Sequence, residues 1–196
     1  MKAIVATDIH GITPEFRSMI LPVVGDALFL SPWETELCPF ADEQEAASVF
    51  ISQNGIASYA RKIALAADGK PAFIVGFSVG ASAAWLHSAS EYSNPESTAT
   101  LFYGSRIRDY LSIVPRFGIT AIFAETESSF QPQQIVSNIV RDKVHAYVEP
   151  GTFHGFMNPN SANFAPASCS VHLQNMARDW ERFCRLLSPR GTSLTR

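Results

Sequence analysis

The sequence is poor in charge and has no long apolar run. Charged residues make up 17% of its 196 residues, and the net charge is −3. Lysines and arginines do not gather into a basic run, which argues against a surface for nucleic acid or for an anionic membrane. No apolar stretch approaches the roughly 20 residues that a membrane-spanning helix needs. We therefore expect neither a nucleic-acid partner nor a membrane partner.

Cysteine is also scarce. The three cysteines, Cys38, Cys169 and Cys184, are odd in number and lack the spacing of a metal site. The first residues, MKAIVATDIHG, contain too short an apolar segment for a signal peptide. We expect reduced thiols, no bound metal and a cytoplasmic location.

Apolar residues, by contrast, make up 46% of the chain. This length and composition suit one globular domain over residues 1–196, with a frayed tail at 188–196. Short apolar runs alternate with longer amphipathic segments, which predicts strands alternating with helices. The predicted strands are 3–6, 27–30, 72–75, 99–103, 119–124 and 144–148. The predicted helices are 13–23, 43–67, 79–90, 130–141 and 170–188, and Asn54-Gly55 is a candidate break in the second of them.

The predicted strands are apolar throughout, without alternation of apolar and polar residues. This pattern indicates strands that are covered on both faces. Together with the intervening helices it predicts an α/β fold with a mostly parallel, doubly wound sheet of about six strands. Ligands of such sheets bind beyond the carboxyl ends of the strands. We therefore expect functional residues to follow strands directly.

The strand at 72–75 runs into the sequence GFSVG, which contains Ser78 and is followed by small residues. Gly-x-Ser-x-Gly between a strand and a helix is typical of a nucleophile elbow, which presents the serine hydroxyl above the sheet. The alternative is a phosphate-binding loop, but neither Gly-x-Gly-x-x-Gly nor a Gly-Lys-Ser/Thr ending is present. Ser78 is therefore the candidate nucleophile.

A serine nucleophile needs a base, which is usually histidine. His154 lies in the loop EPGTFHGF, between the last predicted strand and the last predicted helix, at the ligand edge of the sheet. His87 lies inside a predicted helix, His145 inside a strand and His172 at the start of the last helix. We expect those three to be structural or exposed, and we predict His154 as the base.

The acid that orients the histidine should follow the strand at 119–124. There the chain reads AETES, which offers Glu125 and Glu127 but no aspartate. Glu127 is favoured, because it lies far enough beyond the strand for the loop to turn toward His154. Glu125, nearer the strand, and Asp109, after the preceding strand, are the alternatives.

Hydrolysis of an acyl compound also needs donors for an oxyanion. The expected donors are the backbone N–H groups of Val79 and Ile9, with Gly11 allowing the first loop to approach closely. An ordinary strand-to-helix turn is the alternative for that loop. Asp8, His10 and Gly11 are candidate pocket residues, although His10 could also face solvent. Five aromatic residues are candidates either for the pocket or for the core: Trp33, Phe77, Tyr103, Phe153 and Phe156.

Five motifs in this order resemble the dienelactone hydrolase family of the α/β-hydrolase superfamily: TDIHGIT, VGFSVGAS, LFYG, AETES and PGTFHGF. The resemblance covers about residues 3–187 and implies an α/β-hydrolase fold, reduced here at its N-terminal edge. Founding members of that family have a cysteine nucleophile and an aspartate, where this chain has Ser78 and Glu127. Their arginine that grips the substrate carboxylate is replaced by Asn158.

The motifs and the resemblance together predict a serine hydrolase. It would cleave an ester, thioester or lactone of a small acyl substrate with Ser78, His154 and Glu127, without a cofactor. A non-catalytic binding or scaffold protein on the same fold is the alternative, which the glutamate and the reduced N-terminal edge would suit. Neither the acyl group nor the oligomeric state follows from these motifs.

Overall fold

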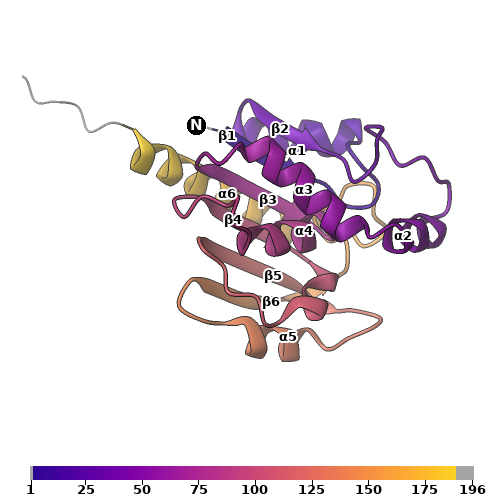
Figure 1. Ribbon diagram of the computed structural model, residues 1–196. Coiled ribbons are helices and arrows are strands. Elements are labelled where there is room, and N and C mark those ends of the chain that lie inside the picture. Colours follow the sequence, from indigo (N-terminus) through magenta and orange to yellow (C-terminus); the bar gives the residue numbers. More distant parts are fainter. Residues whose placement is uncertain (1, 189–196) are drawn as a thin grey trace, which may run out of the picture.

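Six strands form one sheet in which all neighbours run parallel. The computed structural model describes residues 2–188, and its sheet has the order β2-β1-β3-β4-β5-β6 (Figure 1). The predicted α/β fold with a parallel sheet of about six strands is confirmed. The strands are β1 (Lys2–Ala6), β2 (Ala27–Leu30), β3 (Ala72–Phe77), β4 (Thr98–Phe102), β5 (Gly118–Thr126) and β6 (Val144–Phe153).

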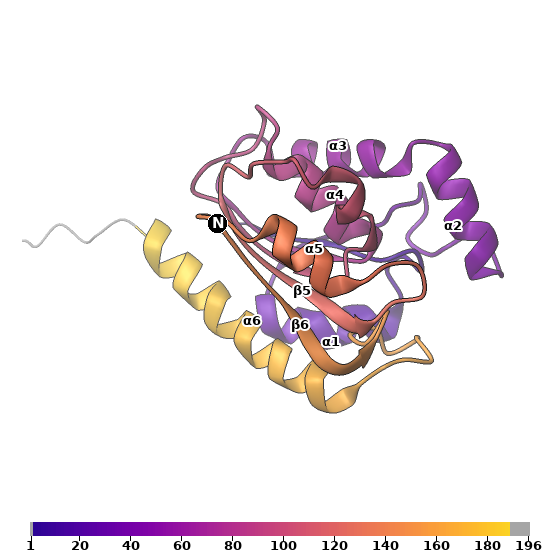
Figure 2. The ribbon, with the colours of Figure 1, turned by 90° about the horizontal axis from the view of Figure 1, so that it is seen from below.

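Helices cover both faces of this sheet. They are α1 (Pro14–Val24), α2 (Glu43–Ser52), α3 (Gly55–Ala67), α4 (Val79–Ser88), the 3-10 helix η1 (Ser105–Tyr110), α5 (Pro132–Ile139) and α6 (Pro166–Leu187). Figure 2 shows α1 and α6 along one face and α3, α4 and α5 along the other. In β1, Ile4 packs into the core on the α3–α4 side, and Ala3 and Val5 pack into the core on the α1–α6 side. Burial of both faces explains why the strands are apolar throughout.

The helix predicted over 43–67 is two helices, α2 and α3. Asn54 between them adopts the left-handed conformation, with φ 55°. Gly55 then passes so close to Phe50 that a Cβ at position 55 would lie 2.4 Å from the Phe50 carbonyl oxygen. The left-handed backbone of Asn54 therefore breaks the helix. Glycine is needed at position 55 because a side chain there would collide with Phe50 of α2.

The last strand is longer than predicted. β6 continues through Pro150 and Gly151 to Phe153, whereas the apolar run ends at Val148. A shift of register near Ala124 lets Thr126 of β5 pair with Phe153 of β6. The residues that follow these two, 127 and 154, therefore leave the sheet side by side.

The other strands and α-helices agree with the predicted ones to within a few residues, and α6 begins at Pro166 instead of 170. Its apolar stripe buries Met176 and Phe183 against the sheet. The 3-10 helix η1 was not predicted. Apart from Ser188, the predicted frayed tail lies outside the described residues. Between residues 2 and 188, no helix combines the length and apolarity needed to cross a bilayer.

Candidate active site

Ser78 occupies a strained turn between β3 and α4. Its backbone has φ 50° and ψ −110°, a combination that residues other than glycine rarely adopt. Glycine is required on both sides. A Cβ at Gly76 would lie 2.6 Å from Ala81 Cα, and one at Gly80 would lie 2.2 Å from the Ala6 carbonyl oxygen. The close approach of β1, β3 and α4 thus explains the Gly-x-Ser-x-Gly pattern.

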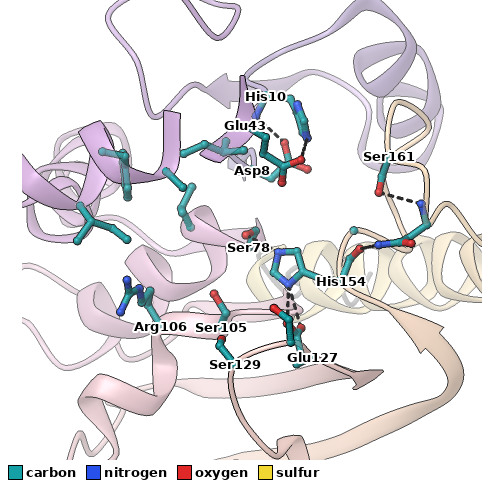
Figure 3. A pocket seen from close by; sticks show the side chains of 18 of the residues that line it. Asp8, His10, Glu43, Ser78, Ser105, Arg106, Glu127, Ser129, His154 and Ser161 are labelled. Atoms are coloured by element: carbon teal, nitrogen blue, oxygen red, sulfur yellow. Dashed lines mark hydrogen bonds and ion pairs between the residues drawn. The ribbon is translucent and has the colours of Figure 1, made fainter. Parts of the chain in front are cut away.

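The structure brings Ser78, His154 and Glu127 into one chain of hydrogen bonds (Figure 3). Ser78 Oγ lies 2.9 Å from His154 Nε2, and His154 Nδ1 lies 2.9 and 3.0 Å from the two Glu127 carboxylate oxygens. The Glu127 side chain is 4% exposed and that of His154 is 32% exposed. Because the carboxylate can only accept, it favours a proton on Nδ1 and leaves Nε2 free to accept one from the serine.

All three side chains follow the carboxyl ends of strands, as expected for a parallel sheet. Ser78 follows β3 directly, and Glu127 and His154 follow the paired residues Thr126 and Phe153. The alternative acids are elsewhere: Glu125 accepts a hydrogen bond from Gly151 N at 2.8 Å, and Asp109 pairs with Arg106 at 3.2 Å.

His87, His145 and His172 do not line the cavity that contains Ser78. His87 is buried in α4 with its Nδ1 3.3 Å from Ser90 Oγ, and burial lowers its pKa to about 4. His172 is buried in α6, 3.2 Å from a Glu149 oxygen, and His145 is exposed on β6.

Ile9 and Val79, the expected oxyanion donors, line the same cavity as Ser78. Val79 is the first residue of α4, where backbone N–H groups have no partner within the helix. The turn that contains Ile9 is held on two sides. Gly11 N donates to the Asp8 carbonyl at 3.1 Å, and the Trp33 indole donates to the Ile9 carbonyl at 2.7 Å.

Ser78 opens into a cavity of about 640 Å³. One wall is apolar and comes from α2, and the opposite wall is polar and comes from η1 and the loop after β5 (Figure 3). The apolar α2 residues are Ala47, Phe50 and Ile51, and α2 also contributes Glu43 from its first turn. The polar wall contains Ser105, Arg106, Arg108, Ser128 and Ser129. The cavity thus offers an apolar side and a polar side with two arginines to a bound molecule, and the carboxylates of Asp8, Glu43 and Glu127 also line it.

Asp8 and His10 line this cavity, whereas the other pocket candidates do not: Gly11, Trp33, Phe77, Tyr103, Phe153 and Phe156. Phe77 and Tyr103 are fully buried in the core on the α1–α6 side. The ring of Tyr103 supports His154 from below, with 5.0 Å between the ring centroids. Phe153 is 51% exposed.

Gly11 serves loop packing and does not line the cavity. It has φ +79°, and a Cβ there would lie 2.2 Å from the Glu36 carbonyl oxygen. The glycine therefore allows the first loop to contact the segment after β2.

The sequence analysis missed most of the cavity wall. Arg106 and Arg108 follow β4 closely, so the rule that ligands bind at strand ends could have identified them. The α2 wall and residues 160–163 carry no local signal, because only the tertiary fold brings them over Ser78. Over residues 2–188, no group of three or more His, Cys, Asp or Glu side chains could hold a metal ion.

Comparison with known sequences gives one partial match. No protein-family model matches the chain. YczH of Bacillus subtilis (strain 168), an uncharacterised protein, is 40% identical over 100 residues, which are 49% of this chain and 47% of YczH. The match therefore spans about half the length of that curated relative.

Solved structures match over nearly the whole chain. A candidate dienelactone hydrolase from Klebsiella pneumoniae has a TM-score of 0.70 at 17% identity, covering 92% of this chain and 86% of its own. A cold-adapted esterase from an Arctic intertidal metagenomic library has a TM-score of 0.60 at 14% identity, with coverage of 90% and 82%. A sugar hydrolase, YeeB, from Lactococcus lactis has a TM-score of 0.58 at 14% identity, with coverage of 94% and 89%. The chain has the α/β-hydrolase fold that these proteins share.

Proposed function

We propose that this α/β-hydrolase-fold protein is a serine hydrolase that cleaves a carboxylic ester, thioester or lactone through an acyl-enzyme. The hydrogen-bonded chain from Ser78 through His154 to Glu127 carries the proposal. Its three members converge from three strand ends at the floor of a cavity. A structural role alone does not account for a serine held at φ 50° with its hydroxyl on a histidine.

In the first half of the reaction, Ser78 Oγ attacks the substrate carbonyl carbon while His154 Nε2 takes the hydroxyl proton. The carbonyl oxygen becomes an oxyanion, which the N–H groups of Val79 and Ile9 would stabilise. His154 then gives its proton to the leaving alkoxide or thiolate as the bond to the acyl carbon breaks. Glu127 keeps the imidazole in the reactive tautomer and stabilises the imidazolium.

In the second half, water attacks the acyl group on Ser78. His154 takes a proton from this water and returns it to Ser78 Oγ, which leaves as the carboxylic acid is released. The 32% exposure of the His154 side chain gives water access to the imidazole edge. Each proton moves between Ser78, His154, the substrate and water, so the proposed cycle needs no cofactor.

The test is covalent labelling with a serine-directed fluorophosphonate. Mass spectrometry of the digested protein should locate the label on Ser78, and heat-denatured protein should not react. Hydrolysis of p-nitrophenyl acetate and butyrate, an acyl thioester and a simple lactone would then identify the preferred bond. Ser78→Ala should remove both the label and the turnover.

Absence of the label from folded protein, together with no turnover of any of these substrates, would contradict the proposal. That result would favour a binding or scaffold protein. In such a protein, Ser78→Ala would leave ligand binding unchanged.

A further inference from the structure

A carboxylate and an amide lie buried against each other beside the candidate catalytic residues. Asp8 is 4% exposed and Asn158 is 1% exposed. Asn158 Nδ2 donates to Asp8 Oδ2 at 2.6 Å, although the two residues are 150 positions apart in the sequence. This Asp8–Asn158 pair joins the loop after β1 to the loop that follows His154.

On the first loop, the Asp8 carboxylate holds the turn that contains Ile9. Its Oδ1 accepts from His10 N at 3.1 Å, and the Asp8 carbonyl accepts from Gly11 N at 3.1 Å. Because the peptide unit is planar, fixing the Asp8 carbonyl also fixes the direction of the Ile9 N–H. The proposed oxyanion donor is thus oriented by bonds that Asp8 makes.

On the loop that follows His154, hydrogen bonds hold both the oxygen and the nitrogen of the Asn158 side-chain amide. Its Oδ1 accepts from Asn160 N at 2.8 Å, which turns its Nδ2 toward Asp8. Its backbone N donates to the Gly155 carbonyl at 2.8 Å, one residue beyond His154. Asn158 is therefore attached to the segment that carries the proposed base.

Burial makes an ionised carboxylate costly unless hydrogen bonds compensate. Burial raises the pKa of Asp8, and His10 and the Asn158 amide oppose this effect. Figure 3 shows Asp8 and Glu127 on either side of the Ser78–His154 contact. Asp8 does not touch the His154 ring nitrogens, which are already bonded to Ser78 and Glu127.

We propose that Asp8 and Asn158 are positioning residues that hold the Ile9 N–H in register with Ser78 and His154. This inference rests on the proposed hydrolase function. Because the proposed role rests on the hydrogen bonds of the pair, we expect kcat to depend on the arrangement of donors and acceptors and not on which of the two residues carries the charge. Its loss should weaken oxyanion stabilisation, which lowers kcat, and should leave substrate binding in the ground state nearly unchanged.

Exchange of the two side chains tests this. Asp8→Asn places an amide against the Asn158 amide, and Asn158→Asp places two carboxylates against each other. The double variant Asp8→Asn/Asn158→Asp restores every bond. Asn at position 8 would accept from His10 N and donate across the contact, and Asp at position 158 would accept that bond and the one from Asn160 N. Glu15→Gln is the matched control, because Glu15, in the first turn of α1, accepts at 3.4 Å from the Asn160 side-chain amide in an exposed contact.

We expect each single variant to lose roughly tenfold or more in kcat on a p-nitrophenyl ester, with KM changed by less than about threefold. The double variant should return to within about threefold of the wild-type kcat, and the control should remain there. A folded double variant as slow as the single variants would overturn the inference, as would single variants with wild-type kcat. A double variant that does not fold would also overturn it, because all the hydrogen bonds are preserved.

The two proposals fail in different ways. A wild-type protein that neither labels nor hydrolyses esters refutes the hydrolase function. A wild-type protein that does both, with Asp8→Asn equally active, refutes only the positioning role. Thermal unfolding of every variant separates loss of fold from loss of kcat.

Discussion

Replacement of Glu127 by glutamine should abolish most of the proposed hydrolase activity. Both carboxylate oxygens lie within 3.0 Å of His154 Nδ1. Glutamine has the same shape, but its NH2 group can donate to Nδ1 and so favours the tautomer with the proton on Nε2. That tautomer cannot take the Ser78 proton, and no anion remains to stabilise the imidazolium.

The size of the loss follows from the burial of the carboxylate. At 4% exposure, water has no room to replace the missing charge. Loss of the acid's charge in a Ser-His-Asp triad costs about 10⁴ in kcat, which is roughly 5 kcal/mol of transition-state stabilisation. The imidazole is partly exposed, so solvent recovers some of this. We expect a decrease of about 10³ to 10⁴.

The measurement is kcat on a p-nitrophenyl ester, with Glu125→Gln as the matched control. Glu125 is two residues away and accepts from Gly151 N at 2.8 Å, a bond that glutamine can also accept. The control should stay within about threefold of wild type. The reasoning is refuted if folded Glu127→Gln keeps more than about a tenth of the wild-type kcat, or if Glu125→Gln loses more than Glu127→Gln.

Two further predictions concern stability. Burial lowers the pKa of His87 from 6.5 to about 4, so the unfolded chain binds more protons than the folded one between these values. Stability should therefore fall as the pH falls through this window, by roughly 3 kcal/mol in all. Urea unfolding at neutral and acidic pH should show this loss in wild type and not in His87→Gln. Equal losses in both proteins would contradict the assignment of the loss to His87. The buried Tyr103 hydroxyl has no hydrogen-bond partner among residues 2–188, so Tyr103→Phe should raise the free energy of unfolding by about 1 kcal/mol. Tyr59→Phe should lower it by a similar amount, because the Tyr59 hydroxyl donates to the Leu30 carbonyl at 2.6 Å. Chemical denaturation of both variants checks this, and a change of the same sign in both would count against it.

Local patterns in the sequence carried much information about this fold. Apolar runs without alternation predicted strands buried on both faces, and their alternation with helices predicted a mostly parallel sheet, because crossover helices cover both faces of such a sheet. The pattern around Ser78 predicted the turn, because Gly76 and Gly80 lie where β1, β3 and α4 leave no space for a Cβ. The rule that ligands bind at strand ends singled out His154 and placed Glu127 near it.

Other features were decided only by the tertiary structure. The choice between Glu127 and Glu125 depends on the register between β5 and β6, where Thr126 pairs with Phe153 and sends the next residues out together. No local signal records that pairing, because it joins segments far apart in the chain.

The same holds for the cavity and for the Asp8–Asn158 pair. Phe77 and Tyr103 were candidates for the pocket or for the core, and only the packing of the elements places both in the core. The α2 wall and the contact between residues 8 and 158 join segments that are distant in sequence. Residue types and short-range spacing determined the elements and the turn, whereas the shape of the site depends on packing between elements, which the sequence by itself does not reveal.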